Sequence, residues 1–180
     1  MLKITIPKSE GFDESKNEFV YFKEQTLQLE HSLVSVSKWE SKWHKPFLTK
    51  ENKSYEETID YIRCMTVTQN VDPTVYSRLT KANIDEVNAY IGDPMTATTF
   101  REDHTSPPNR EIITSEIIYH WMIALNIPPE YQKWHLNRLL TLIKVCNIKS
   151  QPPKKRSKKD IMSQNAALNA ARRKNLNTRG

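Results

Sequence analysis

Residues 111–148 constrain the fold of this chain most strongly. They form two apolar segments of helix length, separated by Pro128 and Pro129, and they contain no glycine. Apolar side chains recur on one helical face of the first segment, at Ile113, Ile117, Trp121 and Ala124. Proline ends a helix that precedes it and suits the first turn of a helix that follows it. We therefore expect two antiparallel neighbouring helices with a short connection.

The second segment carries its own apolar stripe, formed by Leu136, Leu139, Leu140, Ile143 and Cys146. A stripe of this kind usually faces a core, which favours a buried helical hairpin. Both segments are also apolar on more than one face, and a small domain covers only part of such a surface. The alternative hypothesis is an exposed apolar groove that receives a helix of a partner.

The first 28 residues are typical of a β-hairpin. Met1–Pro7 alternates apolar and polar side chains, Gly11 interrupts this pattern, and Phe19–Phe22 is a second β-prone run. A two-stranded hairpin is only marginally stable by itself. We expect residues 1–28 to form an appendage that leans on the helices or on the sheet edge of another protein.

A helix is predicted for Thr26–Lys45, in which Trp39 and Trp43 are one turn apart. Val34 and Val36, with three serines, weaken this helix and leave a strand at its start as an alternative. Three lysines lie close to these tryptophans in the sequence: Lys38, Lys42 and Lys45. One interpretation is an exposed aromatic and basic surface for a protein or a nucleic acid. The other is a pair of core tryptophans covered by lysine stems, and it is favoured because tryptophan is so often largely buried.

Shorter helices are predicted between residues 54 and 92. Ser54 and Glu57 form a capping-box pattern that starts a helix to about Val67. Asp72 and Pro73 open a short helical turn to Leu79. Asn83 caps a helix over Ile84–Tyr90, which Gly92 and Pro94 end. Residues 96–110 are predicted to form a polar loop. The expected fold class is mainly α, a small orthogonal helical bundle over residues 29–150.

The basic charge of this chain is concentrated at its C-terminal end. Residues 149–180 carry ten Lys or Arg and one acidic residue, a net charge of +9, whereas the preceding residues carry a net charge of −3. Residues 151–180 are therefore predicted to be a basic tail, with a nascent helix from Ser157 or Asp160 to about Asn175. Candidate contact residues in this tail are Lys154, Lys155, Arg156, Arg172 and Arg173.

Motifs for catalysis or for cofactors are absent from the sequence. It has three glycines, no phosphate-binding loop, and no Cys/His cluster of metal-binding spacing. Cys64 and Cys146 are expected to be free thiols. Structural roles are expected for four histidines in apolar helical surroundings, namely His31, His44, His120 and His135, and the pair Asp103–His104 is expected to be solvated. We therefore expect neither an enzyme nor a protein that holds a cofactor or a metal.

Targeting signals are also lacking. No run approaches the roughly 20 apolar residues that a membrane-spanning helix needs, and the N-terminus has no signal-peptide core. The expected location is therefore the cytoplasm of the cell that makes the protein, with no membrane contact.

Six blocks of the sequence are similar to one protein family. They are residues 29–43, 61–66, 94–100, 119–128, 134–143 and 167–180, and they span nearly the whole chain. Together they resemble the tail assembly chaperones, a protein family found in long-tailed bacteriophages and in prophages of Gram-positive hosts. The resemblance implies a small, mainly helical, non-enzymatic protein that coats the helical tape-measure protein and recruits tail-tube subunits. It also implies that the protein leaves before the virion is complete.

Such a role needs apolar or aromatic surface that holds an amphipathic helix. The candidate contact residues are Trp39, Trp43, Trp121, Met122 and Trp134. The basic tail is a candidate for binding acidic patches of the client or for tethering a second subunit of this chain.

Two other functions remain open. The basic tail and the Lys–Trp surface also suit a phage protein that binds nucleic acid, although the acidic body offers no basic groove. A structural virion protein, such as a connector or a tail-completion protein, is the third possibility.

Overall fold

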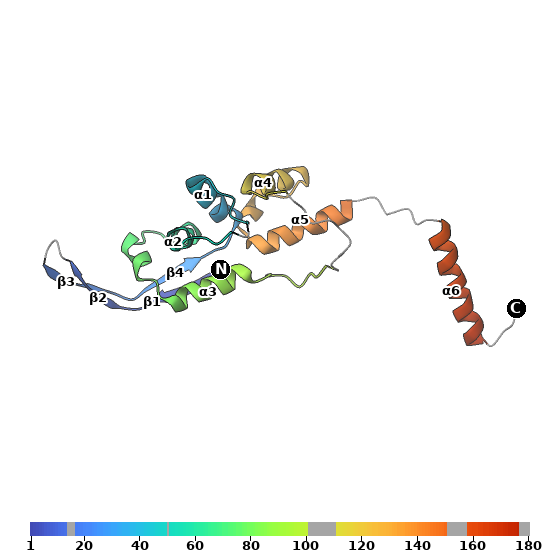
Figure 1. Ribbon diagram of the computed structural model, residues 1–180, viewed down its shortest axis with the longest axis horizontal. Helices are drawn as coiled ribbons and strands as arrows, with labels where there is room; N and C mark the ends of the chain where they lie inside the picture. Colours follow the sequence, from blue (N-terminus) through green and yellow to red (C-terminus); the bar gives the residue numbers. More distant parts are fainter. Residues whose placement is uncertain (14–16, 50, 101–110, 151–157, 177–180) are drawn as a thin grey trace. The chain divides into compact units, whose positions relative to one another are not determined.

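The computed structural model describes residues 1–13, 17–49, 51–100, 111–150 and 158–176 (Figure 1). Its contacts divide the chain into two compact units, Met1–Asn147 and Ile148–Gly180. The protein is mainly α, as the sequence predicts, with a β-ribbon at its N-terminal end.

The ribbon consists of two antiparallel strand pairs. β1 (Leu2–Ile6) pairs with β4 (Gln25–Leu29), and β2 (Ser9–Asp13) pairs with β3 (Glu18–Phe22). Both pairs share one register, so the second pair continues the first. The expected pairing of Met1–Pro7 with Phe19–Phe22 was therefore wrong.

Gly11 explains this difference, because it continues β2 instead of breaking a strand. It lies opposite Val20 in the ladder, and a Cβ at this position would come within 3.1 Å of the Phe22 ring. The missing side chain thus leaves room for an aromatic ring beside the strand.

The helical body stabilises the β1–β4 end of the ribbon. Ile4, Ile6 and Leu27 are almost fully buried, and Val67 N–H donates to the carbonyl of Gln28 at 2.8 Å. α3 lies against β1. The position after residue 28, at which the sequence suggested a domain boundary, falls inside β4, whose apolar side chains belong to the core.

α1 (Leu33–Trp43) begins later than predicted. Residues 25–29 belong to β4, and the helix starts at Ser32, which forms a reciprocal capping box with Ser35. α2 (Tyr55–Met65) begins with the predicted capping box of Ser54 and Glu57, which is confirmed.

Two further elements follow. η1 (Pro73–Arg78) is a 3₁₀ turn capped by Asp72, as predicted. α3 (Lys81–Gly92) begins three residues earlier than predicted, because Thr80 is the capping residue and Asn83 occupies the third helical position. The side-chain amide of Asn83 donates to the Thr5 carbonyl at 3.2 Å, so this residue anchors α3 to β1.

Residues 111–150 do not form the simple helical hairpin that we expected. α4 (Ser115–Ala124) is followed by the 3₁₀ turn η2 (Pro129–Lys133) and then by α5 (Leu136–Ser150). Pro129 therefore opens η2 and not α5. Both α4 and η2 pack on α1, so this helix joins the two halves of the stretch.

The apolar stripes of α4 and α5 differ in how well they were predicted. Leu136, Leu139 and Ile143 of α5 are buried as expected, whereas Leu140 and Cys146 are half-buried. In α4 the buried residues are Ser115, Ile118 and Met122. The predicted face of Ile113, Ile117, Trp121 and Ala124 is instead half-buried or exposed.

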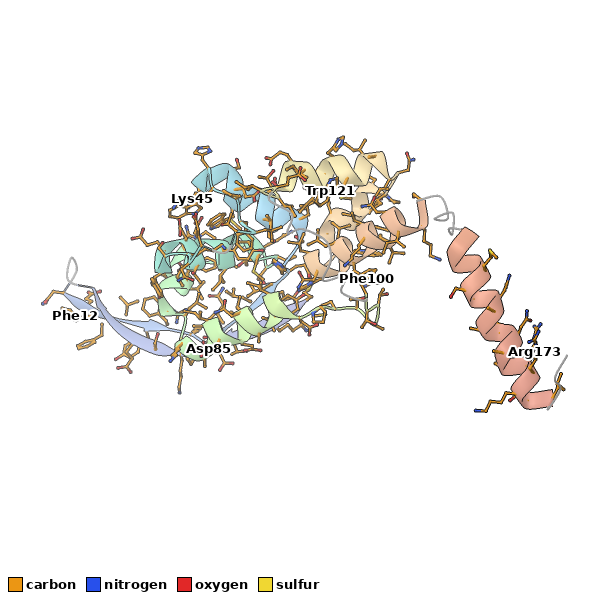
Figure 2. The ribbon with its side chains drawn as sticks, turned by 45° about the vertical axis from the view of Figure 1, so that its right-hand side comes forward. Phe12, Lys45, Asp85, Phe100, Trp121 and Arg173 are labelled. Carbon is orange, nitrogen blue, oxygen red and sulfur yellow. The ribbon has the colours of Figure 1, made fainter. Side chains whose placement is uncertain are left out.

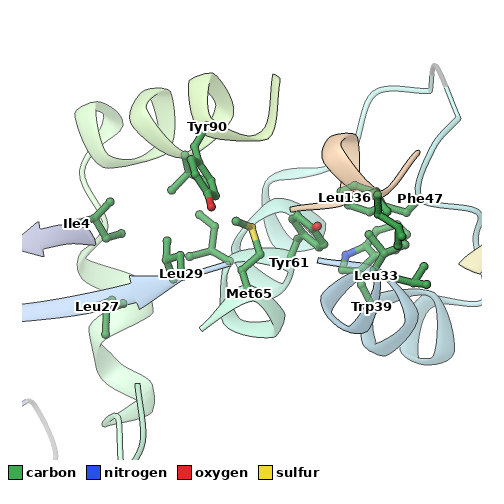
Figure 3. Close-up of a cluster of buried hydrophobic side chains, with 14 of the residues drawn as sticks. Ile4, Leu27, Leu29, Leu33, Trp39, Phe47, Tyr61, Met65, Tyr90 and Leu136 are labelled. Atoms are coloured by element: carbon green, nitrogen blue, oxygen red, sulfur yellow. The ribbon is translucent and has the colours of Figure 1, made fainter. Parts of the chain in front are cut away.

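The core extends from the ribbon into the helices (Figure 3). The rings of Phe47 and Tyr61 are tilted by 31° with centroids 4.0 Å apart, and Trp39 packs on Phe47 in an edge-to-face arrangement at 5.2 Å. The indole N–H of Trp39 donates to the carbonyl of Glu57 at 2.9 Å. These contacts join α1, α2 and the segment between them.

α6 (Lys158–Leu176) is the helix of the second unit, and it covers most of the predicted nascent helix. Its side chains from residue 162 to residue 176 are exposed. None of these residues therefore contributes a buried side chain.

Removal of the tail should leave folding of the first unit intact. A chain truncated after Ser150 is expected to melt within about 2 °C of the full chain, because the described residues that are lost beyond residue 161 bury little surface. Thermal unfolding followed by circular dichroism measures this. A drop of more than about 5 °C would show that the tail stabilises the body.

Candidate functional site

A groove of about 470 Å³ lies between α1, α2 and η1. Tyr55, Ile59 and Arg63 follow one another at intervals of one turn and form the side of α2 that faces it. The full lining consists of Lys42, Trp43, Tyr55, Glu56, Ile59, Asp60, Arg63, Pro73, Tyr76 and Ser77. The groove thus combines three aromatic rings with a mixed set of charges.

Asp60 organises the charges of this groove. Its carboxylate accepts hydrogen bonds from Lys42 Nζ and, at 2.9 Å, from the indole N–H of Trp43, and it lies 3.8 Å from Arg63. Burial alone would raise the pKa of Asp60, but these partners lower it below its usual value. The ionised carboxylate neutralises part of the positive charge and fixes the edge of Trp43.

The aromatic residues of the groove are held in place to different degrees. Trp43 stacks on Trp39 with ring centroids 6.1 Å apart, and the Arg63 guanidinium lies 5.0 Å from the centre of the Tyr76 ring. Tyr55 is 63% exposed, so most of its side chain is free to contact a partner. A preformed aromatic surface of this kind suits the apolar face of another polypeptide.

The two tryptophans of α1 have different environments. Trp39 is 1% exposed and lies in the core, so it is not accessible to a partner in this fold. Trp43 is partly buried and lines the groove. Trp39 is therefore a core tryptophan. Of the two, only Trp43 remains a candidate for contact with a partner.

The other predicted contact residues lie on separate elements. Met122 is buried on α4, and the neighbouring Trp121 is half-buried (Figure 2). Trp134 lies between η2 and α5, stacks on Tyr131 with ring centroids 4.0 Å apart, and has the Arg138 guanidinium 4.2 Å from its ring centre. The structure does not bring these residues together with Trp43 in one groove.

The predicted basic contacts belong to the second unit. Arg172 and Arg173 lie on α6 and are exposed. Lys154, Lys155 and Arg156 lie outside the described residues, as does the pair Asp103–His104.

Sequence reasoning missed the exposed aromatic residues of the outer ribbon. Phe12, Phe19 and Tyr21 are 51%, 66% and 71% exposed, and the rings of Phe12 and Phe19 lie 5.2 Å apart across the two strands. Figure 2 shows Phe12 on this outer part of the ribbon. Alternation along residues 18–22 is the signal that could have separated the inward from the outward side chains.

The four histidines for which structural roles were predicted fall into two classes. His31 and His135 are buried, with ring centroids 5.0 Å apart, and His31 Nδ1 lies 2.5 Å from the hydroxyl of Tyr61. His44 and His120 are exposed, so the expected apolar surroundings were wrong for these two. His44 ends α1 in a left-handed conformation at the helix terminus, where the side chain points to solvent.

Burial controls the charge of the inner pair. It lowers the pKa of His31 to about 3, with a smaller contribution from His135, and it also lowers the pKa of His135. Both rings are therefore neutral at pH 7. Their arrangement between the end of β4 and the start of α5 is that of packed structural residues.

In the residues that the structure describes, no group of three or more His, Cys, Asp or Glu side chains could hold a metal ion. Likewise, the helices that the structure describes are each too short or too polar to cross a membrane. Cys64 and Cys146 are half-buried free thiols.

Comparison with models of protein families, with curated proteins and with solved structures finds no match to this chain.

Proposed function

We propose that this protein is a phage tail assembly chaperone, and that the groove between α1, α2 and η1 holds an amphipathic helix of the tape-measure protein. The observation that carries the proposal is the groove itself, in which Trp43, Tyr55 and Ile59 offer apolar surface to another polypeptide. The sequence blocks that resemble tail assembly chaperones supply the identity of the client.

The size and lining of the groove support a helical client. From Tyr55 to Arg63 the side of α2 that faces the groove spans nine residues, a rise of about 12 Å, which matches about two turns of a second helix. Apolar side chains one turn apart on the client would lie over Ile59 and Tyr55. Lys42, Glu56 and Arg63 at the groove would contact polar groups on the flanks of the client.

Co-expression with the tape-measure protein tests the proposal. The wild-type chain is expected to keep this client in the soluble fraction, whereas the double substitution Tyr55→Ala and Ile59→Glu should reduce the soluble client several-fold. Ile112→Ala is the matched control, since Ile112 is also exposed but lies outside the groove.

Two results would overturn the proposal. One is a client that stays insoluble with the wild-type chain, and the other is a groove variant that solubilises it as well as the wild type does. Tight and salt-sensitive binding to DNA, lost on truncation after Ser150, would favour the nucleic-acid function instead. Presence of the chain in purified particles would favour a structural role in the virion.

A further inference from the structure

The outer ribbon presents an uncovered aromatic face. We call β2 and β3, together with Lys8 and Lys23 at their base, the arm. Glu10 lies opposite Tyr21, and Phe12 lies opposite Phe19, so these four side chains share one face of the arm. Tyr21 and both phenylalanines are more than half exposed. Aromatic side chains of this number on a two-stranded ribbon need a covering surface, because such a ribbon is marginally stable by itself.

The base of the arm carries two lysines and one glutamate. Lys8 and Lys23 line a hollow of about 680 Å³ together with Ser9, Glu10, Tyr21 and Phe22. In the part of the chain that the structure describes, neither lysine forms an ion pair. Along the arm, therefore, the two lysines and Glu10 are followed by aromatic rings, and residues 8 and 12 are separated by about 13 Å.

The outer face of α4 has the complementary pattern. Glu116, His120 and Ile123 are exposed and lie on one side of the helix. Ile123 is 76% exposed, and Glu116 is in the first turn. These two residues are about 10 Å apart along the helix axis. An acidic group is thus followed by an apolar group at nearly the spacing that the arm offers.

We propose that the arm of one copy docks on the outer face of α4 in a second copy of this chain. The Glu116 carboxylate then lies between Lys8 and Lys23, and Ile123 packs against the aromatic residues of the arm. The charges are opposite, and the distance between the charged and the apolar groups matches within a side-chain length. The arm extends away from the helices, and α4 lies toward the other end of the first unit, so the arm does not reach α4 of its own copy (Figure 1).

This contact uses neither the groove nor the tail, and it is therefore independent of the proposed function. One face of a two-stranded arm covers a small area, so the association is weak. We expect self-association that is visible at about 100 µM protein and absent at about 1 µM.

A charge exchange in the full chain tests the contact by sedimentation velocity. Lys8→Glu with Lys23→Glu should weaken self-association at least tenfold, and Glu116→Lys should do the same. The chain that carries all three substitutions should recover association, because the opposite charges then face each other again. Lys174→Glu, which changes an exposed lysine of α6, is the matched control and should associate as the wild type does.

A second variant tests the apolar half of the contact. Phe19→Ser with Tyr21→Ser should abolish association while the helical circular dichroism signal stays unchanged, since both side chains are exposed. A wild-type chain that is monomeric at every concentration would overturn the proposal. So would unchanged association of either charge variant, or a triple variant that fails to recover.

Discussion

Acidification from pH 7 to pH 5 is expected to lower the free energy of unfolding by about 2 kcal/mol through His31 alone. Burial, and to a smaller extent the neighbouring His135, lowers the pKa of His31 from 6.5 to about 3 in the folded chain. The unfolded chain keeps the ordinary pKa and binds the proton first. The stability that this residue contributes is therefore complete above about pH 6.5 and is lost as the pH falls toward 3, by about 1.4 kcal/mol per pH unit.

Urea unfolding at pH 7, 6 and 5 measures this effect. Few carboxylates titrate in this range, so the slope of the unfolding free energy against pH reports mainly the histidines. His135 adds to this slope in the same direction, because its pKa is also lowered. His31→Gln should reduce stability at pH 7 but flatten the slope. His44→Gln, at an exposed position, is the matched control. Equal slopes in His31→Gln and in the wild type would contradict the assignment to this ring.

Replacing Glu40 with alanine is expected to cost about 3 kcal/mol of stability. The carboxylate is buried on α1 and accepts two backbone hydrogen bonds, from Phe47 N–H at 2.7 Å and from Ser115 N–H at 2.8 Å. It therefore holds the chain after α1 and also satisfies the first amide of α4, where Thr114 provides no side-chain cap. Alanine would leave both amides buried without an acceptor.

Denaturant unfolding of Glu40→Ala gives the loss directly, and hydrogen exchange locates it. Faster exchange should appear in α4 and in the segment around Phe47 before it appears in the ribbon. Glu86→Ala is the matched control, because Glu86 is an exposed glutamate inside a helix. A loss below about 1 kcal/mol in the Glu40 variant would show that these two bonds do not anchor α4.

Only part of the candidate site could be predicted from the sequence. Trp43 was identified as a candidate contact from its spacing and its lysine neighbours. Tyr55 was seen only as the residue after a cap, and its place at the groove depends on η1 packing beside α2. The face of α4 was misassigned because Ile113, Ile117 and Ile118 fit two adjacent helical faces equally well.

The sequence by itself determined the elements whose ends depend on local chemistry. The capping box at Ser54, the turn at Pro73 and the helical α6 segment follow from hydrogen bonds and backbone preferences between near neighbours. The mainly α fold class follows from the apolar periodicity in the same way.

Tertiary structure alone decided which face of each element is buried and which strands pair. β1 finds β4 because residues 2–6 and 25–29 bury their apolar side chains together against the helices, and no local signal records that contact. The first amide of α4 finds its acceptor in the carboxylate of Glu40, which is distant in sequence. Contacts of this kind join residues far apart in the chain, and their energy exists only once the whole core has formed.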